Sequence, residues 1–234
     1  MEIIRLGTLY CDGCPIVPGG YVPSGRPILI GDTTAGYELQ WIKAGNLLVA
    51  DRCACIDISW VALDKLGFIY GTPVEINGKL YVCRSLKVGA DDGDENEWDN
   101  LLNVFGEDDN LWHWSNAMFW GQERLPYEPM ERVARGQDFA RTRFCGFKGD
   151  LSSFIGFRPV LEILSPPPPD LSHLIKKEIT VYGPQGTVIE GTMTGFDEYD
   201  VLIDGVPHLP DDCKWATVDG RRVTVNRESV LYLQ

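Results

Sequence analysis

The 234-residue chain lacks the features that would place it in a membrane or an export pathway. No apolar run approaches the roughly 18–20 residues that a membrane helix needs. The N-terminus, MEIIRLGTLYCDG, has no basic start followed by an apolar block, which argues against a cleaved signal peptide. We therefore expect no membrane insertion, and a protein that stays in the cytoplasm or leaves by a route without a cleaved signal.

Motifs for nucleotide binding and nucleophilic catalysis are also missing. The sequence has no Walker or Rossmann glycine loop and no G-x-S-x-G elbow. Histidine is scarce, with three residues, so we do not expect a His-rich metal site. A catalytic Ser-His-Asp triad stays a possible alternative, although no sequence motif supports it. We expect a protein that is not an enzyme.

Basic residues are few and unevenly placed. The chain has 21 Lys and Arg against 34 Asp and Glu, for a net charge of -13. Such a charge repels phosphate backbones, so direct nucleic-acid binding is not expected. Residues 132–158, in contrast, hold six bases against two acids. An acidic stretch forms a candidate surface for a protein partner, and its residues are Asp91, Asp92, Asp94, Glu95 and Glu97.

The seven cysteines cannot all pair, and reduced thiols are the simplest interpretation. A structural zinc site is the alternative, with C-x-x-C and C-x-C supplying four thiolates from Cys11, Cys14, Cys53 and Cys55. The acidic stretch also leaves a structural calcium open, because calcium prefers clustered oxygen ligands. Apart from these two metals we expect no cofactor.

A proline run, SPPPPD at residues 165–170, divides the chain. Prolines lock the backbone in an extended form, so we interpret the run as a stiff spacer between a domain at 1–164 and a module at 171–234. The sequence of the module alternates apolar and polar residues, which predicts either a small SH3-like β barrel or a β meander. We expect this module to serve for docking. Hairpin turns are predicted at Asp204-Gly205 and Asp219-Gly220.

The sequence of the first domain predicts few helices, short strands and long loops, and therefore an α+β fold. Short helices are predicted at Ser59–Gly67 and Glu97–Gly106, each ended by glycine. A hairpin is predicted over Val74–Cys83, with Asn77-Gly78 at the turn. Strands are predicted in RPILIGD, NLLVADRC and GFIYG.

Two segments, ERVARGQDFARTRF and IGFRPVLEIL, resemble the C-terminal end of the formylglycine-generating (sulfatase-modifying factor) family. The matching residues are Arg132, Arg135, Gly136, Arg141, Arg143, Gly156, Phe157 and Arg158. That family is a branch of the C-type lectin fold and includes the variable proteins of diversity-generating retroelements. Upstream, WIKAGNLLVADR, NEWDN and WHW look like phage and prophage proteins. The resemblance covers residues 37–164 and implies a C-type lectin-like domain, with Arg158 inside it.

The chain departs from the family where its chemistry lies. Catalytic members carry two cysteines before the G-F-R strand, bind copper and oxidise a substrate cysteine. Here that segment has only Cys145, so the resemblance implies that the oxidase activity is absent. An enzyme that uses Cys145 is the third and weakest alternative.

Tryptophan and arginine concentrate between residues 112 and 143, and both are enriched where binding energy is high. We expect a binding surface for a protein or glycan, with Trp112 and Trp120 partly exposed. Internal pairing of the arginines, with acids such as Asp138 or Glu123, is the alternative. The candidate ligand-binding residues are Trp112, Trp114, Trp120, Arg135, Arg141 and Arg143.

The leading hypothesis is a non-catalytic binding protein of phage or mobile-element type, associated with the virion. Such a protein could also form a homo-oligomer or assemble with virion proteins. The second hypothesis is an intracellular inhibitor of host defence, which would use the acidic surface to bind a nucleic-acid-handling enzyme.

Overall fold

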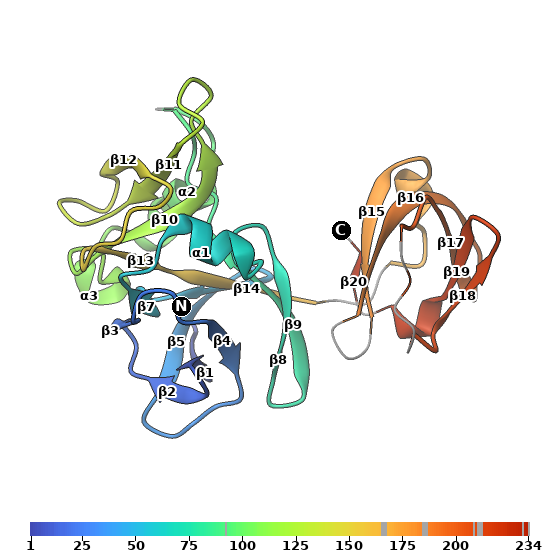
Figure 1. Ribbon diagram of the computed structural model, residues 1–234, viewed down its shortest axis with the longest axis horizontal. Helices are drawn as coiled ribbons and strands as arrows, with labels where there is room; N and C mark the ends of the chain where they lie inside the picture. Colours follow the sequence, from blue (N-terminus) through green and yellow to red (C-terminus); the bar gives the residue numbers. More distant parts are fainter. Residues whose placement is uncertain are drawn as a thin grey trace. The chain divides into compact units, whose positions relative to one another are not determined.

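The structure, a computed structural model, describes residues 1–91, 93–164, 168–183, 187–207, 209, 213–230 and 232–233 (Figure 1). It divides into two compact units, Met1–Ile163 and Leu164–Gln234. The predicted α+β class is wrong, because strands dominate both units. The described residues hold only three short α-helices, which are α1 (Trp60–Lys65), α2 (Glu97–Phe105) and α3 (Asp109–Trp112).

Eight strands form the first sheet of unit one, in the order β2-β1-β5-β6-β14-β9-β8, with β4 also paired to β1. They are β1 (Ile3–Cys11), β2 (Cys14–Ile16), β4 (Ile28–Gly31), β5 (Glu38–Ala44), β6 (Leu47–Ala50), β8 (Thr72–Ile76), β9 (Lys79–Ser85) and β14 (Pro159–Ile163). The sheet curls so that β4 comes into contact with β8 at the other end of the strand order. Beside them the Asn77 amide donates to the Asp32 carboxylate at 2.6 Å, and the Thr33 amide donates to Asn77 Oδ1 at 3.0 Å.

Six strands form the second sheet, in the order β12-β11-β10-β13-β7-β3. They are β3 (Gly20–Tyr21), β7 (Cys55–Ile56), β10 (Met118–Arg124), β11 (Glu131–Arg135), β12 (Arg143–Phe147) and β13 (Ile155–Phe157). Most pairs are antiparallel, but β13 runs parallel to β10 and β3 runs parallel to β7. The order leaves β12 at one edge of this sheet.

Two apolar clusters fill unit one, and strand β10 separates them. Trp120 belongs to the cluster that contains Trp41 and Trp60, whereas its neighbour Phe119 belongs to the cluster that contains Trp98. Successive side chains of a strand point to opposite faces. Strand β10 is therefore buried on both faces, and its aromatic residues are core.

The local signals for the two helices and for the hairpin at Asn77-Gly78 are confirmed. Ser59 caps α1 by accepting a hydrogen bond from the Ala62 amide, and Gly106 ends α2. The hairpin between β8 and β9 turns at Asn77-Gly78, both with positive φ. The prediction of a strand at GFIYG is wrong. Residues 67–71 form turns after α1, and the Phe68 amide donates to the Leu63 carbonyl at 2.9 Å.

The second unit is an antiparallel sheet of six strands, in the order β18-β19-β17-β16-β15-β20. They are β15 (Glu178–Tyr182), β16 (Val188–Phe196), β17 (Asp200–Asp204), β18 (Ala216–Asp219), β19 (Arg222–Asn226) and β20 (Tyr232–Leu233). The hairpin predicted at Asp204-Gly205 is wrong, because β17 pairs with β16 and β19 and not with the strand that follows it. The hairpin near Asp219 exists, with its turn one residue later, at Gly220-Arg221.

Part of the predicted proline spacer, residues 165–167, lies outside the described residues. Its last prolines contact the second unit, because the Arg227 guanidinium donates to the carbonyls of Pro168 (2.7 Å) and Pro169 (2.5 Å). Leu171, just beyond, is fully buried in the core of that unit. Within the described part of the chain, no helix is both long and apolar enough to cross a membrane.

Candidate functional site

The tryptophans predicted to bind a ligand are structural. The expectation that Trp112 and Trp120 are partly exposed is wrong, because both are fully buried. Their indole N–H groups donate to the carbonyls of Gly106 (3.0 Å) and Ile58 (2.9 Å). Trp114 is half-buried, and its indole also donates within the chain, to a loop carbonyl. These donors are satisfied inside the protein.

The predicted arginines pair with acids of the chain itself. Arg135 is buried, and its guanidinium lies 3.2 Å from an Asp99 carboxylate oxygen. Arg141 contacts the same carboxylate at 3.0 Å and that of Glu107 at 2.6 Å. Arg143 lies 3.7 Å from Asp91. The acids therefore come from α2 and its neighbouring loops.

The acidic stretch is only partly a surface. Glu97 accepts two hydrogen bonds from Arg84, at 2.7 and 2.8 Å, and is half-buried. Asp94 is exposed, but its carboxylate accepts hydrogen bonds from the backbone amides of Ala90 and Asp91, which closes a turn. Glu95 and Asp91 are exposed, and Asp92 lies outside the described residues.

The four cysteines considered for zinc do not form a cluster. Among the described residues, no three His, Cys, Asp or Glu side chains lie together as a metal site would need. Cys11 and Cys14 flank the β1–β2 hairpin turn, whereas Cys53 and Cys55 are buried. Burial raises the pKa of Cys53 to about 11 and also raises that of Cys55, which disfavours the thiolate form that zinc binds.

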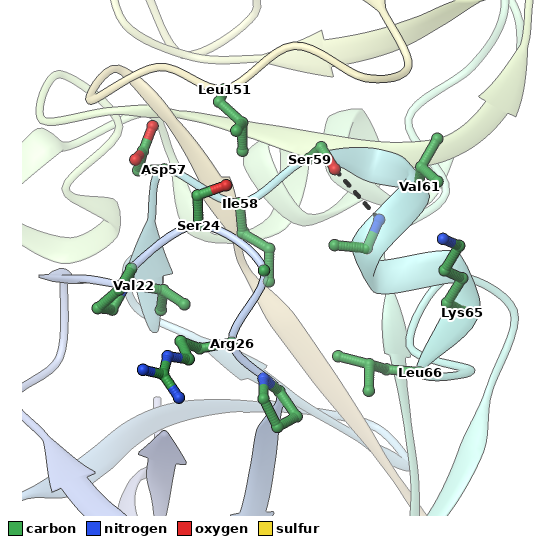
Figure 2. A pocket seen from close by; sticks show the side chains of 14 residues that line it. Val22, Ser24, Arg26, Asp57, Ile58, Ser59, Val61, Lys65, Leu66 and Leu151 are labelled. Atoms are coloured by element: carbon green, nitrogen blue, oxygen red, sulfur yellow. Dashed lines mark hydrogen bonds between the residues drawn. The ribbon is translucent and has the colours of Figure 1, made fainter. Parts of the chain in front are cut away.

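A pocket of about 360 Å³ opens in unit one beside α1 (Figure 2). Its walls come from loop 22–27, residues 57–59, α1 and Leu151. The loop holds its shape through a turn in which the Arg26 amide donates to the Pro23 carbonyl at 3.1 Å. The volume lies within the range of roughly 300–1,000 Å³ of ligand pockets.

The pocket is apolar in its middle and charged at its rim. Figure 2 shows Asp57 and Lys65 on opposite sides, with Ile58 between them. Asp57 has a positive φ of 63°, an uncommon conformation for a residue other than glycine. The Asp57 carboxylate raises the pKa of the Tyr21 hydroxyl. Its polar lining residues include Ser24, Ser59, Asp57 and Lys65.

Strand β12 presents a second candidate site. Phe144 and Phe147 are 43 % and 48 % exposed. The Phe147 amide and carbonyl both bond to Asp150, at 3.0 and 2.8 Å. Because backbone groups alternate sides along an antiparallel strand, the N–H and C=O of Cys145 also point away from β11, toward the open edge.

Seven exposed apolar side chains lie between residues 127 and 154, on β12 and on the segments next to it in sequence. They are Tyr127, Met130, Phe139, Phe144, Phe147, Leu151 and Phe154. Exposed apolar groups of this size commonly mark contact surfaces. The sequence shows the motif R-F-C-G-F but not its place at a sheet edge, so the prediction missed these residues.

Comparison with protein-family models, curated proteins and solved structures finds no match for the chain.

Proposed function

We propose that the chain is a non-catalytic protein-binding protein, in which the open edge of β12 binds an extended segment of a partner polypeptide. The observation that supports it most is the combination of an open strand edge with exposed Phe144 and Phe147. Extended peptides add to such edges through backbone hydrogen bonds, and side chains on both faces supply specificity.

The charge around β12 indicates the kind of segment. Lys148 follows directly after the strand in a chain that is strongly acidic, whereas Arg143 at its start is already paired with Asp91. A segment that alternates apolar and acidic residues would complement the rings and, through an acidic residue near Lys148, this cation. A virion-associated binding protein of a phage or mobile element is one form of this proposal.

The binding geometry depends on the outward backbone groups of Cys145, which gives a sharp test. The probe is a library of random linear peptides selected on the immobilised full chain. We expect enrichment of sequences that alternate apolar and acidic residues. Replacing Cys145 with proline removes the outward N–H donor, so Cys145→Pro should lose binding of the enriched peptides, whereas Cys145→Ala should retain it.

A second pair of variants tests the side chains. The double variant Phe144→Ser/Phe147→Ser should weaken peptide binding by at least about tenfold, as loss of contact aromatics does. Val104→Ser changes another exposed apolar residue, 74 % exposed on α2, and should leave binding unchanged. The proposal fails if no peptide is enriched, or if Cys145→Pro, with an unchanged circular dichroism spectrum, binds as tightly as Cys145→Ala.

The acidic-surface hypothesis has less support in the structure. Glu97 is paired with Arg84, so the exposed charge is smaller than the sequence indicates. No described feature favours a defence enzyme as the partner over the peptide that β12 would accept.

A further inference from the structure

The pocket of Figure 2 is a site of its own, because no residue of β12 lines it. Its volume of about 360 Å³ is near the lower end for ligand pockets, which fits a molecule about the size of an amino acid. Its ligand can therefore be considered independently of the partner of β12.

The middle of the pocket is built to accept an apolar group. Val22 and Ile58 are buried, Leu66 is half-buried, and Leu151 is 47 % exposed beside them. The Val61 amide donates to the Lys148 carbonyl at 3.0 Å, which holds the segment leading to Leu151 against α1. Filling this hollow with a branched apolar side chain removes apolar surface from water on both partners.

The rim supplies charges of both signs at separate places. The ammonium of Lys65 forms no ion pair with any residue that the structure describes, and the side chain is exposed. Arg26 adds a second cation, which is partly neutralised by Asp12 at 3.1 Å. Asp57 lies across the pocket from Lys65 (Figure 2). A ligand with an anionic group near Lys65 is thus favoured over a neutral one.

We propose that this pocket binds an apolar side chain that carries an adjacent carboxylate. Free apolar α-amino acids and the C-terminal residues of peptides share this chemistry. The carboxylate is placed toward Lys65, and the side chain lies against Ile58 and Leu66.

Calorimetric titration of the full chain with leucine, N-acetylleucine and leucinamide tests the proposal. We expect at least one of the two carboxylate-bearing probes to bind, and leucinamide to bind at least about tenfold more weakly than that probe. Lys65→Met should weaken carboxylate binding by a similar factor, and Lys65→Arg should largely restore it. Lys177→Met removes an exposed cation of the second unit that does not line the pocket and is the matched control.

The same titrations distinguish the two sources of the ligand. If the site takes a free amino acid, leucine binds more tightly than N-acetylleucine. If it takes a peptide end, N-acetylleucine binds at least as well, and a leucine-terminated peptide loses binding when its carboxyl group is amidated. The proposal is overturned if neither carboxylate probe binds, or if Lys65→Met binds as well as the unaltered chain. Phe144→Ser/Phe147→Ser should bind the probes normally, so failure at one site is distinguishable from failure at the other.

Discussion

The guanidinium of Arg158 lies 5.0 Å from the centre of the Trp98 ring, and both side chains are fully buried. A second ring, that of Phe119, lies 4.6 Å away. The guanidinium donates to backbone carbonyls, among them those of Asp51 (3.1 Å) and Trp112 (2.6 Å). Burial lowers its pKa to about 10, so the group still carries its charge at neutral pH. Ring faces and carbonyl dipoles thus stabilise a charge in the core of unit one.

Replacing Arg158 with methionine should destabilise unit one by about 3 kcal/mol or more. The reason is that at least two buried carbonyls lose their donor, each at a cost of about 1–3 kcal/mol. Urea unfolding followed by tryptophan fluorescence measures the change. Arg158→Lys keeps the charge but has only one small ammonium, and should be less stable than the unaltered chain. Equal stability of Arg158→Met would mean that apolar packing replaces the buried charge without loss.

Gly156, two residues before Arg158, should not tolerate a side chain. A Cβ atom there would lie 2.1 Å from the Cys55 carbonyl oxygen, in the paired strand β7. Backbone cannot move aside as a flexible side chain can, so Gly156→Ala should cost about 3 kcal/mol, the upper end of overpacking penalties. Gly31→Ala is the control, since its nearest neighbour, the Leu29 side chain, lies at 3.4 Å. Similar melting temperatures for the two variants would contradict this account.

The sequence predicted what depends on neighbouring residues. Ser59 as a cap, Gly106 as a helix end and Asn77-Gly78 as a turn are local effects, and each is confirmed. Strand pairing is not local. The parallel pairing of β13 with β10, for example, follows from packing of the whole unit, and so the fold class was mispredicted.

The candidate site was harder to predict for two physical reasons. Burial on both faces of β10 places the adjacent residues Phe119 and Trp120 in different cores, so alternation gives no sign of which aromatic is exposed. The exposed residues Phe144 and Phe147 are recognisable only when β12 is known to be an edge strand. The pocket combines three segments that are distant in sequence, which are residues 22–27, residues 57–66 and Leu151.

Replacement of Glu95 and of Glu97 should affect the free energy of unfolding differently, although both residues belong to the same acidic stretch of the sequence. Glu97 bonds to Arg84 and to the Lys87 amide, whereas Glu95 is exposed. Glu97→Gln should therefore lower the free energy of unfolding by about 2 kcal/mol or more, because a charged hydrogen bond is lost beside a buried guanidinium. Glu95→Gln should change it by less than about 0.5 kcal/mol. Urea unfolding at neutral pH compares them.

The stabilisation by the Glu97–Arg84 ion pair should depend on pH, because the fold shifts the pKa of Glu97. Burial alone would raise it, but hydrogen bonds and charge attraction from Arg84 outweigh burial and lower the pKa below 4.5. The stabilisation is complete above the unfolded value and is lost as pH falls through the folded value. Below pH 4.5 the unaltered chain should thus lose stability more steeply than Glu97→Gln. Parallel stability curves for the two proteins would show that the ion pair with Arg84 contributes nothing.

The buried cysteines should make the first unit sensitive to alkali. Burial raises the pKa of Cys53 from 9.0 to about 11, with the nearby Arg158 opposing the shift, and also raises the pKa of Cys83. Between pH 9.0 and about 11 the unfolded chain loses the Cys53 proton while the folded chain keeps it, so stability falls as pH rises. A shift of two pKa units corresponds to about 2–3 kcal/mol for this one thiol.

Cys53→Ala isolates that contribution. The variant should be less stable than the unaltered chain at pH 7, because the substitution leaves a small cavity, but its stability should fall less steeply above pH 9. Cys14→Ala, which changes an exposed thiol, is the control and should keep the full slope. Urea unfolding at pH 7, 9 and 10 measures the three proteins. If Cys53→Ala and Cys14→Ala lose stability equally with pH, the Cys53 thiol is not the group that resists ionisation in the fold.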